Sequence, residues 1–234
     1  MSTNNFNRYP ALRFFEGLGE EEQNQLKVIH FKQKEYLIRE EEIGAPHLYY
    51  ILEGVCISDI ILPKDDHLFV GFKILPQEFV GLLETISPQP LKRRASIMAK
   101  TPVTALTVSR AQLLRWQVHY PQLYNQIICH VLTVQFRSRS LNINCASLDL
   151  RHAGAYYLHY LYETYLKGCY PKGYQGPVKI WDTQQEIAEV LSRDKRSISR
   201  LIGSLRSSGH ITLYKGKVHI DNQQAEAMLR LLTD

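Results

Sequence analysis

Basic side chains are concentrated in one short stretch of the sequence, residues 192–219. The stretch contains one acidic residue, Asp194, and seven basic ones: Arg193, Lys195, Arg196, Arg200, Arg206, Lys215 and Lys217. Lys and Arg neutralise backbone phosphates, and an Arg guanidinium can donate two parallel hydrogen bonds to the edge of a guanine. A solvated helix face normally mixes both signs of charge, so that simpler interpretation is disfavoured. The stretch predicts contact with double-stranded DNA.

Two short helices joined by a tight turn are predicted to position these side chains. Thr183 and Glu186 have the spacing of a capping box, which predicts that the first helix begins there. The buried sides of the two helices are marked by Ile187, Val190 and Leu191, then by Ile198, Leu201, Ile202 and Leu205. Ser192 lies in the turn where Gly is usual, and we expect it to adopt a left-handed backbone at a cost of about 1 kcal/mol. This order of elements is typical of a helix-turn-helix.

The second helix supplies the candidate base contacts, because its polar residues project away from its apolar side. These residues are Lys195, Arg196, Ser197, Ser199 and Arg200. Arg196 and Arg200 are the first candidates for contacts with guanine. Residues 209–221 then predict two short strands that turn at residues 215–217. Such a hairpin would form a wing whose Lys215 and Lys217 contact phosphates.

A long helix with heptad spacing is predicted after Pro121. Spacings of three and four residues alternate through Tyr124, Ile127, Val131, Val134, Ser138, Leu141, Cys145 and Leu148. The pattern continues without Gly or Pro, and Arg137 and Arg139 flank the polar Ser138, which favours a parallel dimer along this seam. The alternative is a helix that packs on its own domain, because the same spacing also serves monomeric cores.

The N-terminal half of the sequence has the pattern of a small antiparallel β structure. Residues 47–62 predict two strands joined at Glu53-Gly54, and residues 93–109 predict two more around Thr101-Pro102. Closure into a barrel or jelly roll would protect the strand edges. The segment before them, residues 12–29, is predicted to be helical, with Leu12, Phe15 and Leu18 available to cover one end of the β core.

Composition limits the class of protein. The 234 residues are 44% hydrophobic, which is enough for two modest cores, and the net charge of +5 leans towards an anionic partner. The four cysteines have no C-x-x-C spacing, which disfavours a zinc ribbon, a thioredoxin-like site or a disulfide scaffold. No apolar run has the length of a signal peptide or a membrane span. We therefore expect a cytoplasmic protein with no membrane partner.

Enzyme chemistry is not predicted. The sequence contains no nucleophile paired with a base, no paired carboxylates and no metal-ligand spacing, so we expect no catalytic residue and no metal site.

Taken together, these segments resemble the Crp/Fnr transcription regulators over residues 12–220. The resemblance rests on LIREEEIGAPHLYYILEGVCISDI, on EFVGLLE followed by RRASIMAKTPVTALTVSRAQLLRW, on the heptad helix, and on QQEIAEVLSRDKRSISRLIGSLRSSGHI. It implies an α+β fold with three parts. These are an effector-sensing double-stranded β-helix of the jelly-roll, cyclic-nucleotide-binding type at residues 1–120, a dimerisation helix at 121–148 and a winged helix-turn-helix at 149–234.

The function implied by the resemblance is sequence-specific regulation of transcription by a homodimer. The implied partners are double-stranded DNA and a second copy of the chain, with RNA polymerase as a further candidate. The family's phosphate contacts fall near Thr183 and Gln185, and its base contacts fall on Lys195, Arg196 and Arg200. Arg196 stands where many relatives have Glu, so the family's usual half-site is not expected here.

The effector region departs from the members that bind cyclic AMP. Gly81 is kept, but Leu82 takes the place of the acid that accepts a hydrogen bond from the ribose. Arg93 matches the phosphate-binding arginine, and strand alternation points Arg94 the other way. Ser138 matches a small polar residue that touches the effector across the dimer, or it only fixes the helix register. We expect no cofactor, and cyclic AMP is disfavoured. An unknown small-molecule effector stays open, another anionic ligand included.

Three alternatives stay open at this point. The first is a ligand-binding module that acts through a protein partner, although the basic second helix disfavours it. The second is another sensor chemistry. An iron-sulfur type is disfavoured because no Cys precedes Cys56, and a haem type would depend on scattered residues such as His47 or His67. The third concerns Cys145, which is either a buried structural thiol or half of an intersubunit disulfide.

Overall fold

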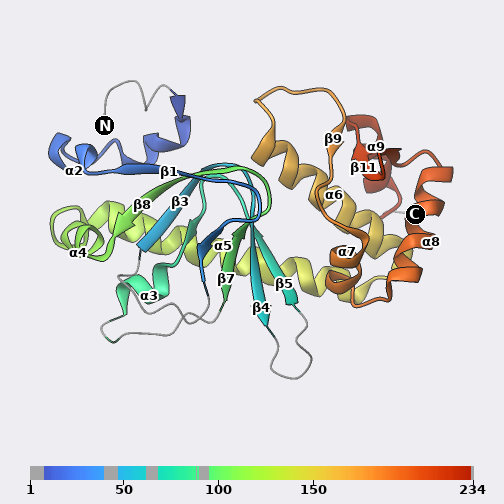
Figure 1. Cartoon of the computed structure of the whole chain (residues 1–234), viewed down its shortest axis with the longest axis horizontal. Helices are drawn as coiled ribbons and strands as arrows, with labels where there is room; N and C mark the ends of the chain where they lie inside the picture. The colour runs from blue at the N-terminus through green and yellow to red at the C-terminus, as the bar shows by residue number, and fades with distance from the viewer. Residues whose placement is uncertain (1–7, 40–46, 62–67, 88, 90–94, 233–234) are drawn as a thin grey trace. The chain divides into compact units, whose positions relative to one another are not determined.

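The computed structural model describes residues 8–39, 47–61, 68–87, 89 and 95–232 (Figure 1). The chain divides into two compact units. Unit 1 comprises residues 1–68 and 72–136, and unit 2 comprises residues 69–71 and 137–234. None of the described helices has an apolar stretch long enough to cross a membrane.

Unit 1 is built on two four-stranded sheets. The first has the order β1 (Lys27–Phe31), β8 (Val103–Ser109), β3 (His47–Glu53) and β6 (Phe79–Val80). The second has the order β2 (Tyr36–Ile38), β7 (Ser96–Ala99), β4 (Cys56–Ile61) and β5 (Leu68–Ile74). Apart from β4 and β5, strands adjacent in space are not consecutive in sequence. The pairs of β8 with β1 and β3 and of β7 with β2 and β4 are antiparallel. The predicted α+β fold with an antiparallel β-roll is confirmed.

The two predicted turns of the β-roll pack against each other. Gly54 has a φ of 88°, and a Cβ there would lie 2.2 Å from the carbonyl oxygen of Pro102. The Thr101 hydroxyl accepts a hydrogen bond of 2.9 Å from the backbone N–H of Val55. Gly54 is therefore required both for its left-handed backbone and for the close approach of the other turn.

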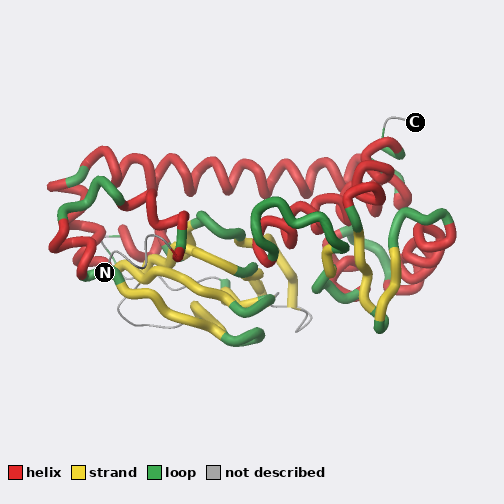
Figure 2. The backbone as a smooth tube through the Cα atoms, turned by 90° about the horizontal axis from the view of Figure 1, so that it is seen from above, coloured by secondary structure: helices red, strands yellow, loops and turns green. Residues whose placement is uncertain are grey.

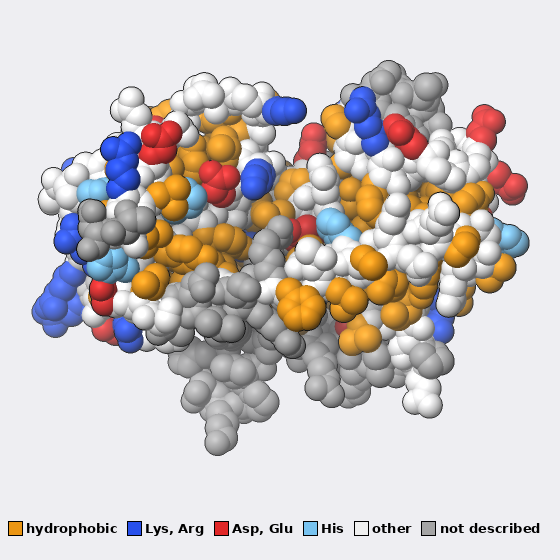
Figure 3. Space-filling model, turned by 180° about the vertical axis from the view of Figure 1, so that it is seen from behind, with side chains coloured by type: hydrophobic (Ala, Val, Ile, Leu, Met, Phe, Trp, Pro, Cys, Tyr) orange, Lys and Arg blue, Asp and Glu red, His pale blue; other side chains and the backbone are white. Residues whose placement is uncertain are grey.

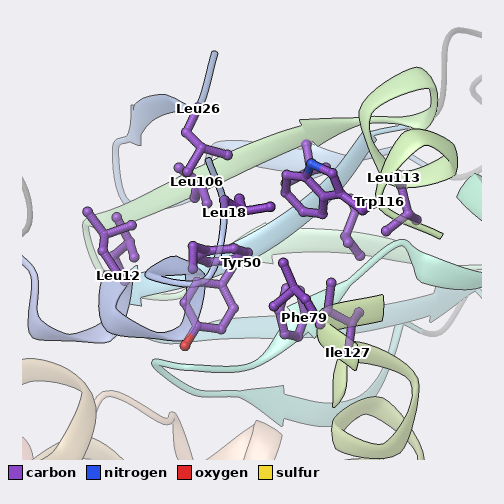
Figure 4. Close-up of a cluster of buried hydrophobic side chains, with 14 of the residues drawn as sticks. Leu12, Leu18, Leu26, Tyr50, Phe79, Leu106, Leu113, Trp116 and Ile127 are labelled. Atoms are coloured by element: carbon purple, nitrogen blue, oxygen red, sulfur yellow. The ribbon is translucent and has the colours of Figure 1, made fainter. Parts of the chain in front are cut away.

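The segment before β1 covers one end of the roll. It forms a short 3-10 helix, η1 (Pro10–Phe15), and the helix α2 (Glu20–Asn24). Leu12, Phe15 and Leu18 are buried in one aromatic-rich core with Tyr50 and Phe79 (Figure 4). The predicted helix over residues 12–29 is wrong at its C-terminal end, because residues 27–31 hydrogen-bond along β8 as strand β1.

Glu22 of α2 connects the segment before β1 to α4 (Arg110–His119) through hydrogen bonds. Its carboxylate accepts hydrogen bonds from the Arg115 guanidinium at 2.9 Å and from the Trp116 indole N–H at 2.9 Å. The hydrogen bond from Arg115 lowers the pKa of Glu22, and the smaller opposing effect is burial. The ionised form of Glu22 is therefore the form that stabilises the fold.

Glu22→Gln is expected to remove part of the acid sensitivity of the protein. Because the folded-state pKa lies below the ordinary value of 4.5, the stabilisation is fully present above pH 4.5 and is lost as the pH falls through the folded pKa. Urea unfolding at several pH values between about 3 and 7 measures this. The variant should be less stable near neutral pH and should lose less stability on acidification. An unchanged pH profile would contradict the role given to Glu22.

Unit 2 contains a three-stranded sheet and five helices among its described residues. α5 (Pro121–Ser147) is one uninterrupted helix that begins in unit 1 (Figure 2). It is followed by α6 (Leu150–Cys169), β9 (Val178–Lys179), α7 (Gln184–Val190), α8 (Lys195–Ser207), β10 (Thr212–Tyr214), β11 (Lys217–Ile220) and α9 (Asn222–Arg230). The sheet order is β10-β11-β9, and the pairs are antiparallel.

Three tyrosines of α6 pack inside unit 2. Tyr157, Tyr162 and Tyr165 are buried, and the Tyr165 hydroxyl donates a hydrogen bond to the buried carboxylate of Asp182. Asp182 directly precedes the cap of α7, so this bond fixes the start of α7 against the long helix α6.

α3 (Leu82–Ile86) completes unit 1. It begins at Gly81, whose φ of 87° turns the chain from β6 into the helix.

Candidate nucleic-acid interface and effector cavity

Side-chain caps fix the first residues of α7 and α8. The Thr183 hydroxyl accepts from the Glu186 N–H at 3.2 Å, and the Glu186 carboxylate accepts from the Thr183 N–H at 2.6 Å. At α8, the Asp194 carboxylate accepts from the Ser197 N–H at 2.9 Å and from its hydroxyl at 2.6 Å. These bonds lower the pKa of Asp194, so the cap stays ionised at neutral pH.

The turn between the two helices is strained at the predicted residue. Ser192 has a φ of 51°, in the left-handed region that favours glycine. The backbone N–H of Arg193 donates to the Ala188 carbonyl at 2.9 Å, which closes the end of α7.

Ser192→Gly is expected to raise the free energy of unfolding by about 0.5–1 kcal/mol, because glycine adopts this φ without the clash that a Cβ suffers. Ser192→Val is expected to lower it by more than that amount, because a β-branched residue tolerates this φ poorly. Thermal unfolding of the two variants measures both changes. A more stable valine variant would contradict the strain.

One side of α8 is buried and the opposite side is exposed. Ile198, Leu201, Ile202 and Leu205 are the buried residues. Arg196 and Arg200 lie one helical turn apart on the opposite side, and both are exposed. Gly203 continues this side, and a Cβ added there would meet no atom within 4 Å. The exposed side thus carries two long cationic side chains followed by a small residue.

The guanidinium groups on α8 are available for an external partner. In the part of the chain that the structure describes, neither Arg196 nor Arg200 forms an ion pair with a carboxylate. The buried side of α8 packs against α6, where Leu201 lies so close to Gly154 that a Cβ there would be 2.3 Å from its methyl group. Helix α6 therefore holds α8 with its arginines outward.

The wing is a tight hairpin. Lys215 and Gly216 have φ values of 47° and 72°, which are the two left-handed residues of a type I′ turn. Tyr214 and Lys217 form the last paired positions of β10 and β11. Lys215 lies at the exposed tip, and Lys217 is half-buried.

The other predicted DNA contacts differ in whether their side chains already form hydrogen bonds within the protein. Thr183, Gln185, Lys195 and Ser199 are exposed. The Gln185 side chain donates to Glu189 at 3.1 Å, and the Ser197 hydroxyl is engaged by Asp194. The structure thus gathers Lys195, Arg196, Ser199 and Arg200 on one helix, whereas the hydroxyl of Ser197 is bound to the capping residue Asp194.

Two exposed residues beside this set were not among the predicted contacts. Arg193 lies in the turn before α8, and Tyr214 on the wing is exposed, with the Lys215 ammonium 5.4 Å from its ring centroid. The positive charge of Arg193 gave a signal in the sequence. The sequence does not indicate that Tyr214 is exposed, because an aromatic residue in a short strand is usually buried.

Unit 1 contains a cavity of about 260 Å³ at the predicted effector region. Gly81 and Leu82 both line it, together with Val131 and Val134 of α5. Arg93 and Arg94 lie outside the described residues, and so does the side chain of Ser138. The cavity is open in this chain, and Leu82 forms an apolar part of its wall.

Comparison with known proteins addresses both units. Residues 28–119 match the family model of the cyclic nucleotide-binding domain. A CRP-family transcriptional regulator from Thermus thermophilus has a TM-score of 0.71 at 21% identity, over 88% of this chain and 97% of that chain. The chain has the Crp/Fnr fold. The resemblance found in the sequence is thereby confirmed.

Two further Crp/Fnr-fold structures are similar over most of their length. FixK2 from Bradyrhizobium japonicum has a TM-score of 0.67 at 15% identity, over 87% of this chain and 96% of that chain. The c-di-GMP-responsive regulator CLP from Xanthomonas campestris has a TM-score of 0.65 at 14% identity, over 91% of this chain and 99% of that chain. Comparison with curated proteins finds no match to this sequence.

Within this Crp/Fnr fold, α5 does not present the predicted heptad seam to solvent. Ile127 has 0% exposed surface because it belongs to the core of unit 1, and Tyr124 and Val131 pack against that core. Val134 is also buried. The predicted seam is therefore wrong at Ile127 and Val134 as a contact with a second copy, because these two side chains are already covered by their own domain.

Cys145 is buried in the Crp/Fnr fold of this single chain. Burial raises the pKa of its thiol to about 11, so the thiolate that attacks disulfides is scarce at neutral pH. The interpretation as a structural thiol is favoured over the intersubunit disulfide.

Proposed function

We propose that this chain is a homodimeric regulator of transcription that binds specific double-stranded DNA through α8. The observation that carries the proposal is the exposed pair Arg196 and Arg200 opposite the buried side of α8. An α-helix fits the major groove, and Arg is the side chain best suited to a guanine edge there. The wing lysines would contact phosphates beside the groove. Recruitment of RNA polymerase is a further part of this proposal.

The sequence preferred by this protein would differ from that of relatives with an acidic residue at the Arg196 position. A carboxylate accepts a hydrogen bond from cytosine, whereas a guanidinium donates to guanine or to phosphate. The proposal therefore includes a half-site in which a guanine faces Arg196 or Arg200.

The homodimer would form through the outer side of α5. Cys129, Leu132 and Phe136 follow one another at spacings of three and four residues, on the side of the helix opposite Ile127. Leu132 and Phe136 expose 54% and 67% of their surface, and Cys129 is also exposed. Figure 3 shows hydrophobic side chains exposed on the face of the molecule seen from behind. This second heptad stripe supports a seam with a second copy in a register different from the one predicted from the sequence.

The alternative function, a ligand-binding module that acts through a protein partner, agrees less well with the surface of α8. Such a surface would be expected to carry apolar or acidic residues on α8, whereas its exposed side carries Lys195, Arg196 and Arg200.

The first test is the salt dependence of DNA binding. Binding of a fluorescent random-sequence duplex of about 30 base pairs is expected at about 50 mM salt, and it should weaken at least 10-fold at about 200 mM. Each phosphate contact adds about 0.9 to the negative slope of log K against log salt. An absence of binding at the lower salt concentration would overturn the proposal.

A further inference from the structure

We propose that the cavity of unit 1 binds a small, uncharged, largely apolar molecule that carries one hydrogen-bonding group. The inference rests on the proposed function in treating this cavity as the effector site, and it names the chemical class of the effector. Five observations support it: the composition of the walls, an orphaned hydroxyl, the distribution of charge, the size of the cavity and the contact with α5.

One wall of the cavity is a row of side chains across the second sheet. Ile38 of β2 and Ser58 of β4 are both register partners of Ile97 on β7. Directly opposite residues in antiparallel strands point to the same face of the sheet. All three line the cavity, and so does Ile74 of the neighbouring strand β5. The row is apolar except for Ser58.

The hydroxyl group of Ser58 is buried at the wall of the cavity. The residue is 1% exposed, and its Oγ has no hydrogen-bond partner among the described residues. A buried hydroxyl without a partner is costly, and most such groups bind protein, water or a ligand. Because Ser58 lines the cavity, a hydroxyl or carbonyl group of a bound molecule would satisfy it.

The charge of the described walls disfavours an anion. They contain two carboxylates, Glu78 and Glu84, and no Lys or Arg. Glu78 is buried, and its carboxylate accepts a hydrogen bond of 3.0 Å from the backbone N–H of Leu75, so it serves to hold the adjoining turn. Leu82 adds a further apolar group. A cyclic phosphate placed among these described residues would lose its hydration and lie near two carboxylates.

The size of the cavity fits a small ligand. Sites for drug-sized molecules usually occupy about 300–1,000 Å³, and this cavity is about 260 Å³. A monocyclic alcohol or ketone is of suitable size.

The occupant would act on the proposed dimer helix. Val131 and Val134 of α5 line the cavity, while Leu132 and Phe136 on the same two turns carry the exposed stripe. A ligand packed against the valines would therefore alter the position of the residues proposed to contact the second copy.

Ligand-observed fluorine NMR on the full chain without DNA tests the inference. The probes are 4-fluorobenzyl alcohol and 4-fluorobenzoate, which have nearly the same shape and differ in charge, and cyclic AMP is the competitor. We expect the alcohol to bind at least about 10-fold more tightly than the benzoate and cyclic AMP not to displace it. Tighter binding of the benzoate, or displacement by cyclic AMP, would overturn the proposal.

Two variants locate the binding. Ser58→Ala should weaken binding of the alcohol by about 5- to 10-fold, because it removes the only hydroxyl among the described walls. Thr107→Ala is the matched control, since it removes a strand hydroxyl that lies outside this cavity, and it should leave binding unchanged. Ala95→Phe fills the cavity without touching the hydroxyl and should abolish binding. Equal binding by Ser58→Ala and wild type would overturn the assignment.

DNA binding is measured separately on the same proteins. If the alcohol binds as expected and the duplex does not, the proposed function fails and the ligand class stands. If the duplex binds and the alcohol does not, the inference about the cavity fails alone.

Discussion

Arg200→Ala is expected to weaken binding to the preferred DNA site by about 5- to 150-fold for each half-site, which corresponds to the loss there of one bidentate contact worth about 1–3 kcal/mol. Arg200 is exposed on the side of α8 opposite its core residues, so its removal should not disturb the fold. The loss should be confined to duplexes with the preferred base at one position of the half-site. Anisotropy titrations with the preferred duplex and its single-base variants measure both effects.

Two further variants separate base contacts from charge. Lys217→Ala on the wing should weaken binding to every sequence by a similar factor and reduce the salt slope by about one. Arg230→Ala is the matched control, because this exposed arginine lies on α9 and forms an ion pair with Glu226 at 3.8 Å. It should leave DNA binding within about twofold of wild type. Equal losses for Arg200→Ala and Arg230→Ala would show that α8 does not contact the bases.

The double variant Leu132→Glu, Phe136→Glu is expected to dissociate the dimer. Each added carboxylate would have to be buried unpaired in the proposed seam, and the two copies would also repel each other. Sedimentation equilibrium should then report the mass of the single chain, 27.1 kDa, in place of twice that mass. Binding to a two-half-site duplex should fall by about 100-fold or more, because each half-site would be bound independently.

The matched control for this variant is Val118→Glu. Val118 is 71% exposed, and it lies on α4 rather than on the stripe of α5. It should remain dimeric and bind DNA as the wild type does. A double variant that stays dimeric would contradict the proposed seam, and a wild type that is monomeric at micromolar concentration would do so more directly.

The helix-turn-helix could be predicted in detail because its signals are local. The capping box at Thr183, the left-handed backbone at Ser192 and the turn at Gly216 each depend on a few consecutive residues. The apolar residues of α8 repeat with the helical period, which identified its buried side. The exposed position of Arg196 and Arg200 follows from the same period.

The seam on α5 could not be assigned from spacing alone. Two heptad stripes are present on this helix, one through Ile127 and Val134 and the other through Leu132 and Phe136. The first belongs to the longer heptad pattern, which predicts it as the dimer contact. Which stripe is covered depends on tertiary packing against η1 and the β-roll, and helical periodicity carries no such information.

The cavity was predicted only in part for a similar reason. Gly81 and Leu82 were found because they belong to one short motif. Ser58 was missed, because its neighbours Ile38 and Ile97 come from strands distant in sequence. Only the register of the sheet brings these three residues to one wall.

The most direct test of the proposed pair of recognition helices is selection of binding sites from a randomised duplex pool with the full-length protein. Two α8 helices related by a twofold axis should enrich an inverted repeat whose half-site centres lie about 10 base pairs apart, one turn of DNA. Each half-site should contain a guanine that is no longer preferred by Arg200→Ala. Enrichment of a single unpaired half-site, or of no sequence, would contradict the account.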